Sequence, residues 1–423
     1  MAWYNPLTWF RGAWQTAPIS SPILGTMFGG AGTTAAGIAV NPTSALGCSA
    51  WWSGIRLLSE STALLPCSLD EIDGNERKPA PGHPVSVLLA KPCGSMTRFT
   101  FFQTLMNHVL SRGNAYAEII PGGNGYPIAL ELLDPDDIMP GWVESSVDRQ
   151  YRKVYQSRSE GEVWDQSQIL HVPGLGFDGL AGFPVWEFAR HSIALDLAAE
   201  NYGASWFGSG GRPSGWLKYP GKLSPEAADN VRRTWREKHS AGSHEVALLT
   251  EGLEFMPHEN DPTKAQAVEI RRFASIVVAR FLRVPPHMLY EMSAAPTVNG
   301  LDQLSREYLM YSLSPWLTLI EEEVQDKLLR AKDRGRYLAR FDERPLLRTD
   351  GLQRSQIDQL DVNSGFRTLA EIRRDRGLPF IPGTERLRVP LNYGTLREDG
   401  TVDNNGNGNG ISNQFVDPGA QAP

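Results

Sequence analysis

The sequence predicts an α+β fold, with a mixed first half and a mostly helical second half. Three observations support this prediction. Apolar residues recur at helical spacing early in the chain, and strand-like segments joined by a glycine-rich turn follow them. The second half then contains several segments that begin with helix-capping residues. With 423 residues, 41% of them hydrophobic and 21% charged, the chain has the composition of a globular protein, and its length indicates two or three domains.

The N-terminal segment, residues 1–40, is expected to be a flexible arm. No residue in the stretch 12–55 is charged, which raises the question of a membrane span. The stretch is rich in Gly, Ser, Thr and Pro, however, and it has no run of about 18 strongly apolar residues. Its start also lacks the basic head, long apolar core and cleavage site of a signal peptide. We therefore expect no membrane partner and no targeting out of the cytoplasm.

The first half is expected to alternate helices with strands. An apolar pattern at helical spacing starts at Thr43 and stops near Pro66, and a second helix fits residues 95–112. Strands fit residues 114–120, 126–133, 151–157 and 168–172, with a glycine-rich turn at 121–125. A long helix from Pro184 to about Phe207 follows the last strand.

The second half is expected to contain an excursion made of a helix, a hairpin and a helix. Ser224 followed by Pro225 is a strong helix start for a charged helix that ends near His239. Strand-like stretches at 245–250 and 253–256 indicate a small hairpin, after which a helix runs from Asp261 to the residues before Pro285. Residues 290–300 lack apolar periodicity and form a long loop. The remaining expected elements are a helix at 301–329 interrupted by Pro315, a short strand at Phe341, helices at 350–360 and 368–376, and a disordered tail.

The charge balance bears on the kind of partner. A formal net charge of −7 has the wrong sign for a protein that grips a polyanion through many phosphate contacts. Tight, static DNA binding is therefore disfavoured. A conduit for sliding DNA needs walls that attract it weakly or repel it, and the composition is compatible with that role.

The main alternative function depends on residues 174–179, which match G-x-G-x-x-G and follow an apolar strand. The match suggests a cytoplasmic dinucleotide-binding enzyme. That site needs its third glycine in the first turn of the helix, where free backbone N–H groups meet the pyrophosphate. Gly182 and Pro184 place the helix start several residues later, and the acids Asp196 and Glu200 fall inside the helix instead of after a second strand. The segment therefore favours a structural loop.

Other catalytic patterns are incomplete. His244 and Glu245 begin H-E-x-x-H, but Leu248 stands where the second histidine belongs. Residues 215–222 resemble a phosphate-binding P-loop with one residue too many, and Leu223 follows where Ser or Thr should bind magnesium. No close cysteine pair suits a metal or redox site, because the chain has only Cys48, Cys67 and Cys93. We expect no enzymatic activity, no cofactor and no metal.

Five stretches, in this order along the chain, resemble the portal proteins of tailed bacteriophages, the large family that accompanies the common phage capsid fold. The stretches are residues 41–66, Gly-Asn-Ala-Tyr at 113–116, the strand 169–172 with the turn 182–185, residues 269–289, and residues 368–379. The resemblance covers roughly residues 41–385. It implies a closed ring, usually a homododecamer, that serves DNA packaging and ejection as the head-tail connector at one capsid vertex.

The resemblance also implies a division of the chain into named regions. They are an arm (1–40), a wing (41–222 and 301–348), two stem helices (223–241 and 260–284), a clip (242–259), a tunnel loop (285–300), a helical crown-like region (349–398) and a tail (399–423). The implied partners are further copies of the chain, the terminase large subunit, a major capsid or scaffolding protein, a head-completion adaptor and double-stranded DNA. The protein would reside in the virion after assembly in the host cytoplasm. Another phage head or tail ring protein is a further alternative.

Candidate site residues follow from these regions. For the DNA-facing tunnel loop they are Ser293, Thr297 and Asn299. For terminase contact at the clip they are His244, Glu245, Glu251 and Glu254. For the stem helices they are Arg232, Arg236, Lys264, Arg271, Arg272 and Arg280, which either pair with neighbouring stems or remain solvated.

Overall fold

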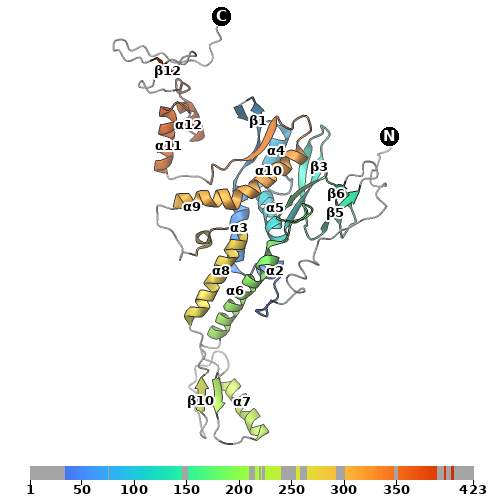
Figure 1. Ribbon diagram of the computed structural model, residues 1–423, viewed down its shortest axis with the longest axis vertical. Coiled ribbons are helices and arrows are strands. Elements are labelled where there is room, and N and C mark those ends of the chain that lie inside the picture. Colours follow the sequence, from blue (N-terminus) through green and yellow to red (C-terminus); the bar gives the residue numbers. More distant parts are fainter. Residues whose placement is uncertain are drawn as a thin grey trace. The chain divides into compact units, whose positions relative to one another are not determined.

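A computed structural model gives the fold and divides the chain into two compact units, Met1–Leu346 and Leu347–Pro423 (Figure 1). The structure describes residues 34–74, 76–144, 151–208, 215–218, 221, 224–239, 254–257, 264–291, 301–346, 351–387, 395–396 and 402–403. Most of the expected arm and tail therefore lies outside the described residues. Among the helices that are described, none is both long and apolar enough to cross a membrane.

Two helices form the centre of the first unit. The helix expected from Thr43 is two helices, α2 (Pro42–Ala45) and α3 (Ser49–Leu64). The break at 46–48 leaves the apolar spacing intact, which is why the sequence pattern does not reveal it. α3 packs against α5 (Arg98–Arg112), which begins where the Thr97 hydroxyl accepts from the N–H of Thr100. Trp51 and Phe101 are among the large side chains buried between the helices and the sheets.

The first unit also contains three small three-stranded antiparallel sheets. In the first, β3 (Asn114–Pro121) lies between β4 (Pro127–Leu133) and β8 (Ile169–Pro173); the three strands and the β3–β4 hairpin were predicted, but the pairing of β3 with β8 was not. The second has the order β5 (Ile138–Glu144), β6 (Tyr151–Ser157), β7 (Val163–Asp165). The third has the order β11 (Tyr337–Phe341), β1 (Cys67–Asp73), β2 (Glu76–Pro79). A short helix, α4 (Pro84–Ala90), packs on β1.

The chain leaves the sheets through a long helix and returns through another. α6 (Val185–Gly208) leads out, α8 (Lys264–Leu282) leads back, and the two helices pack along each other (Figure 1). The helix that packs along α8 is therefore α6, whereas the predicted stem consists of α8 and the helix after Ser224. That helix, α7 (Pro225–His239), exists as predicted and is capped by the Ser224 hydroxyl, but it is charged along its length. α6 instead offers an apolar face that includes the buried Ile193.

Only one strand of the predicted hairpin lies among the described residues. The strand expected at 253–256 is present as β10 (Glu254–Pro257), but it pairs antiparallel with β9 (Gly215–Lys218). The expected partner at 245–250 lies outside the described residues. The ladder therefore joins the two ends of the excursion, which are distant in sequence.

The helix expected at 301–329 is interrupted as Pro315 predicts. α9 (Leu301–Glu307) continues into a π-helix, η5 (Tyr308–Leu313), before α10 (Ser314–Leu328) begins. The carbonyl of Leu309 accepts from both the backbone N–H and the hydroxyl of Ser314, the latter at 2.8 Å. Pro315 has no backbone N–H and cannot make the usual helical hydrogen bond to the preceding turn. The wider π-helical turn before α10 accommodates this missing bond.

The second unit contains two predicted helices, α11 (Gly351–Asn363) and α12 (Leu369–Asp375). The predicted capping box is present, since the Thr368 hydroxyl accepts from Glu371 N and a Glu371 carboxylate oxygen accepts from Thr368 N. Arg376 joins the helices through a hydrogen bond of 2.9 Å from its Nε to Asp358 Oδ2. Part of the expected disordered tail is a strand, because β13 (Val402–Asp403) pairs with β12 (Thr395–Leu396).

Candidate functional site

Close backbone packing fixes where α6, the first helix of the excursion, starts. Gly174 N donates to Gly113 O at 2.7 Å. A Cβ on Gly182 would lie 2.6 Å from Gly174 Cα and would also overlap the Gly113 carbonyl. Only glycine fits at such a backbone crossing. The three glycines therefore hold the segment before α6 against the end of α5.

A buried network of side chains locks the same crossing. Asn114 Nδ2 donates to Gly182 O at 2.9 Å, and Gly182 N donates to Asn114 Oδ1 at 2.8 Å. His171 Nε2 lies 3.0 Å from the same Oδ1, and the Tyr155 hydroxyl lies 3.2 Å from His171 Nδ1. Because an amide oxygen only accepts, Nε2 carries the imidazole proton and Nδ1 accepts from Tyr155. Three strands and the entry to α6 are thus tied together.

His171 is a structural residue in this network. Burial lowers its pKa well below the ordinary 6.5, and the positive charges of Lys153 and Lys327 act in the same direction. The ring also stacks on Tyr116, with centroids 4.6 Å apart. A neutral, fully hydrogen-bonded imidazole has no free nitrogen to serve as a base.

The segment 174–179 lacks the geometry of a dinucleotide site. It is irregular, and α6 begins at Val185, well beyond the last glycine of the motif. The N-terminus of α6 therefore cannot present its free N–H groups within the glycine loop. Leu175 and Phe177 in this loop are exposed, while Gly174 serves the backbone crossing.

Two neighbouring arginines on α8 make their ion pairs within the chain. Arg271 Nη2 lies 3.3 Å from Glu200 Oε2, and Arg271 Nε lies 3.5 Å from Oδ1 of Asp196 on α6. Asp196 is fully buried, and neither of its oxygens has a hydrogen-bond partner in the described residues. It lies against Cys48, and burial together with the negative charge of Asp196 raises the pKa of the Cys48 thiol to about 12. Arg271 thus supplies the compensating charge for a buried carboxylate.

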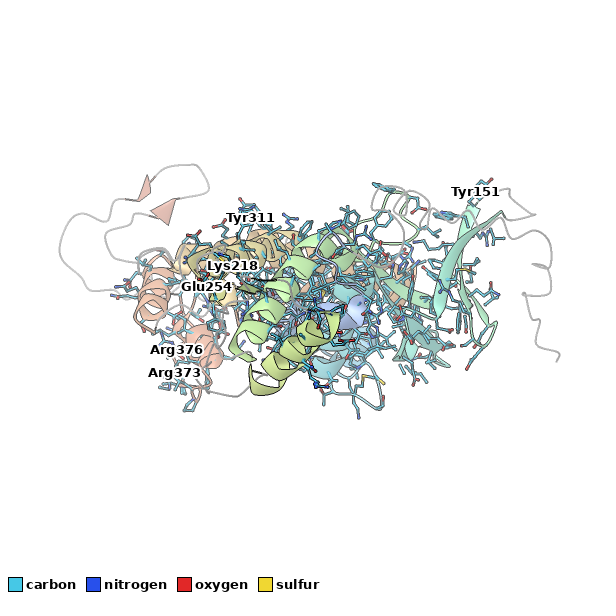
Figure 2. All side chains as sticks on the ribbon, turned by 90° about the horizontal axis from the view of Figure 1, so that it is seen from below. Tyr151, Lys218, Glu254, Tyr311, Arg373 and Arg376 are labelled. Carbon is cyan, nitrogen blue, oxygen red and sulfur yellow. The ribbon has the colours of Figure 1, made fainter. Side chains whose placement is uncertain are left out.

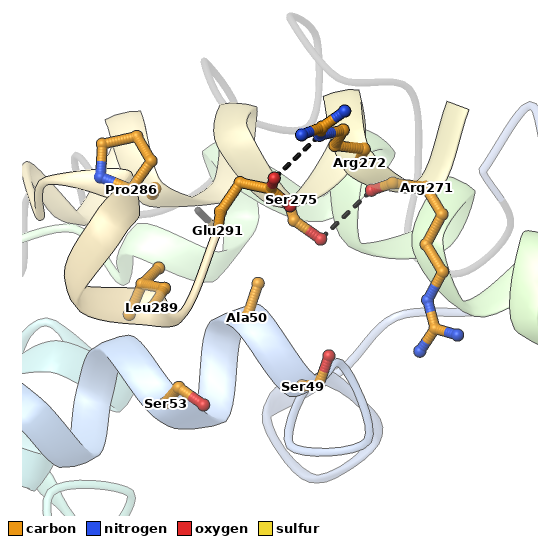
Figure 3. Close-up of a pocket in the computed structure, with 10 residues that line it drawn as sticks. Ser49, Ala50, Ser53, Arg271, Arg272, Ser275, Pro286, Leu289 and Glu291 are labelled. Atoms are coloured by element: carbon orange, nitrogen blue, oxygen red, sulfur yellow. Dashed lines mark hydrogen bonds and ion pairs between the residues drawn. The ribbon is translucent and has the colours of Figure 1, made fainter. Parts of the chain in front are cut away.

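Arg272 anchors the start of the predicted tunnel loop. Its Nε lies 2.7 Å from Oε1 of Glu291, beside an open cavity of about 400 Å³ between α3, α8 and the 3-10 helix η2 (Pro286–Leu289) (Figure 3). The Arg271 side chain points away from this pair (Figure 3). The lining serines and arginines include no nucleophile with an adjacent base. Nor does the described part of the chain contain a cluster of His, Cys, Asp or Glu that could hold a metal ion.

Of the remaining candidate residues, some have described side chains and the others lie partly or wholly outside the description. Glu254 begins β10, and its Oε2 lies 3.5 Å from Nζ of Lys218 on β9. Figure 2 shows the two residues side by side. Arg232 pairs with Asp229 on its own helix, and Arg280 is exposed without a partner among the described residues. Arg236 and Lys264 belong to α7 and α8, but their side chains lie outside the description. Six candidates lie wholly outside the described residues: Ser293, Thr297, Asn299, His244, Glu245 and Glu251.

Asn114, Asp196 and Glu291 are site residues that the sequence reasoning missed. The sequence could have indicated Asp196, because it falls on the same apolar helix face as Ile193, and a charged side chain on a buried face requires a partner. No local sequence pattern indicates the hydrogen-bonding roles of Asn114 and Glu291, since their partners are distant in sequence.

Comparisons with known proteins agree on one family. The sequence model described as "Phage portal protein" matches residues 49–377. The chain is 32% identical over 381 residues to the probable portal protein of Streptomyces phage phiC31, covering 86% of this chain and 82% of the relative. It is 29% identical over 370 residues to the portal protein of Enterobacteria phage HK97, covering 86% of each.

Solved structures share the fold. The virion of a native gene transfer agent particle matches with a TM-score of 0.55 at 22% identity, covering 84% of this chain and 98% of that one. The neck of a native gene transfer agent particle, computed with C12 symmetry, matches with a TM-score of 0.51 at 20% identity, covering 85% and 99%.

Proposed function

This chain belongs to the phage portal protein family, and we propose that twelve copies form the ring-shaped channel at one capsid vertex through which DNA is packaged and ejected. The observation that carries the proposal is the excursion formed by α6, the β9–β10 ladder and α8. Two helices that leave a body and return to it can be repeated around an axis to build a tube. The C12 symmetry of the related neck structure supports a count of twelve.

The fold changes the proposed regions of the subunit. We assign the stem to α6 and α8 instead of α7 and α8, because α6 is the helix that packs along α8. The clip then becomes residues 209–263, which include α7 and the β9–β10 ladder. The tunnel loop narrows to residues 292–300, with Ser293, Thr297 and Asn299 as its candidate DNA-facing residues, because η2 and the Arg272–Glu291 pair occupy the preceding segment. The first part of the wing then ends before α6 (Val185–Gly208), while its second part (301–348) and the crown-like region (349–398) keep their places.

The charge balance supports a conduit over a clamp. The net charge of −7 gives the chain few opportunities for the many phosphate contacts that would arrest DNA. Family membership, the irregular 174–179 segment and the structural role of His171 all favour a non-enzymatic protein. The family match also favours a portal over another phage ring component. The proposed location is the portal vertex of the virion, after assembly in the host cytoplasm.

The clip is the proposed docking surface for the terminase large subunit and later for the head-completion adaptor. It would present the exposed Glu254 together with the undescribed His244, Glu245 and Glu251. The wing is the proposed contact with a capsid or scaffolding protein.

Terminase docking is tested by reversing the cross-strand pair of the clip. Glu254→Lys changes the surface charge and breaks the pair with Lys218, whereas the double variant Lys218→Glu, Glu254→Lys reverses both charges and keeps the pair. If terminase binds this surface, both variants still assemble into rings but bind purified terminase at least tenfold more weakly than the wild type. Wild-type affinity in both would remove Glu254 from the docking surface. Normal affinity in the double variant alone would show that the pair only stabilises the ladder.

A further inference from the structure

We propose that exposed apolar stripes on α8 and α6 are the two complementary halves of the contact between neighbouring copies, with α8 of one copy packed against α6 of the next. This inference rests on the proposed ring. It is an alternative to the prediction that arginines of the stem pair with neighbouring stems.

The α8 stripe consists of Ile270, Phe273, Val277 and Phe281, which the 3.6-residue helical period places on one face. It lies immediately beside the buried row of the same helix, Ala274, Val278 and Leu282, each one residue further along the chain. The fractional exposures of Ile270, Phe273 and Phe281 are 45%, 59% and 39%. α8 therefore carries more apolar surface than the rest of its own chain covers.

The α6 stripe consists of His191, Leu195, Ala198 and Tyr202, again at helical spacing. Leu195 and Tyr202 are 40% and 48% exposed, while Ile193 and Asp196 occupy the opposite, buried side of the helix. α6 thus packs inward with one face and presents a second, partly aromatic face to solvent.

A second copy of this chain is the occupant that fits these surfaces. A ring contact is heterologous, so each copy must carry two different patches that complement each other. The two stripes meet that requirement, since they lie on two different helices. If the two stripes meet in a ring, the five exposed side chains together bring on the order of 400 Å² of apolar surface into the contact.

The charges of the helix pair argue for the same assignment. Arg271 is engaged by Asp196 and Glu200, and Arg272 is engaged by Glu291, all within one chain. Neither arginine is free to supply the main attraction to a neighbour. Among the described residues of the two helices, Arg280 is exposed without a partner, and the apolar stripes provide the larger exposed surface for a contact.

The test uses the full chain and a charge pair placed across the proposed contact. Phe273→Asp and Leu195→Lys each put a charge into an apolar contact, and the double variant puts opposite charges on its two sides. Ring assembly is followed by native mass spectrometry and negative-stain imaging over a range of protein concentrations. Val87→Asp, at a site 60% exposed on α4, is the matched control. The thermal midpoint of the dispersed subunit checks folding, and Phe273→Ala provides a milder variant.

We expect each single charged variant to need at least tenfold more protein for half-assembly. Phe273→Ala should be impaired to a smaller degree, Val87→Asp should assemble normally, and the double variant should recover most of the loss. Undiminished rings in either single charged variant, or a double variant no better than the singles, would overturn the α8–α6 contact while leaving the portal function intact. Failure of the wild-type chain to form rings would overturn the portal proposal itself, and this inference with it.

Discussion

Replacing Asn114 by Ala is predicted to destabilise the subunit far more than an ordinary buried asparagine would. The side chain makes three buried hydrogen bonds, to both backbone groups of Gly182 and to His171 Nε2, at 2.8 to 3.0 Å. Truncation leaves two donors and one acceptor without partners in a site that excludes water. Each orphaned group costs about 1–3 kcal/mol, and we expect a loss of about 3–5 kcal/mol in the free energy of unfolding.

Asn124→Ala is the matched control, because Asn124 also accepts a backbone hydrogen bond, from Tyr126 N at 3.1 Å, but does so in an exposed turn. Water replaces the lost partner there, so the expected cost is below about 1 kcal/mol. Urea unfolding of the dispersed subunit, followed by tryptophan fluorescence, measures both. If Asn114→Ala lies within 1 kcal/mol of Asn124→Ala, the network does not secure the entry to α6. Rings of Asn114→Ala should also form poorly, since the segment that leads into α6 would no longer be held in place.

Three further predictions concern the same crossing and the helix pair. His171 is neutral in the folded chain with a pKa well below 6.5, so the unfolded chain takes up the proton first as the pH falls. Stability is therefore lost below about pH 6.5, and His171→Gln should remove about 1.4 kcal/mol of the wild-type loss between pH 7.5 and 5.5, as measured by urea unfolding at both values. An unchanged pH dependence would contradict this protonation state. Gly182→Ala should prevent stable folding, because its Cβ would overlap backbone, whereas Gly203→Ala in α6 has open space and should raise the thermal midpoint slightly. Equal midpoints for the two alanine variants would refute the backbone crossing. Arg271→Ala should cost about 1–3 kcal/mol in urea unfolding, because it leaves a buried carboxylate without its nearest positive charge, while Arg280→Ala should cost nearly nothing. Similar losses for both arginines would show that the buried carboxylate does not depend on Arg271.

Local signals predicted the elements that depend on neighbouring residues. The β3–β4 hairpin, α5, α7 and α12 follow from turn glycines, apolar spacing and capping side chains that lie within a few positions of each other. The interruption at Pro315 was predictable for the same reason, although the π-helix that accommodates it was not.

Elements whose partners are distant in sequence were either not predicted or predicted without those partners. β1 carries charged residues and is a strand because it pairs with β11 near the end of the first unit, which no local pattern indicates. The pairing of β10 with β9, and of α8 with α6, likewise depends on tertiary contacts across the whole excursion. Spacing alone could therefore identify these helices and strands but not choose their partners.

In the candidate site, too, local sequence patterns predicted some features, while others depend on tertiary contacts. Rejection of the 174–179 glycine motif as a cofactor site was possible from the distance to the next helix start. The use of Gly174 and Gly182 against Gly113, by contrast, required the folded backbone. The predicted arginine contacts between copies remain a prediction, and the described partners of Arg271 and Arg272 are intramolecular.

Native mass spectrometry of the purified full chain, combined with negative-stain imaging, tests the central claim most directly. We predict a closed ring of about twelve copies around a central hole, in keeping with the C12 symmetry of the related neck structure. A chain that remains a monomer or dimer at every concentration would contradict the proposed ring, and a nucleotide cofactor bound to it would favour the enzyme alternative.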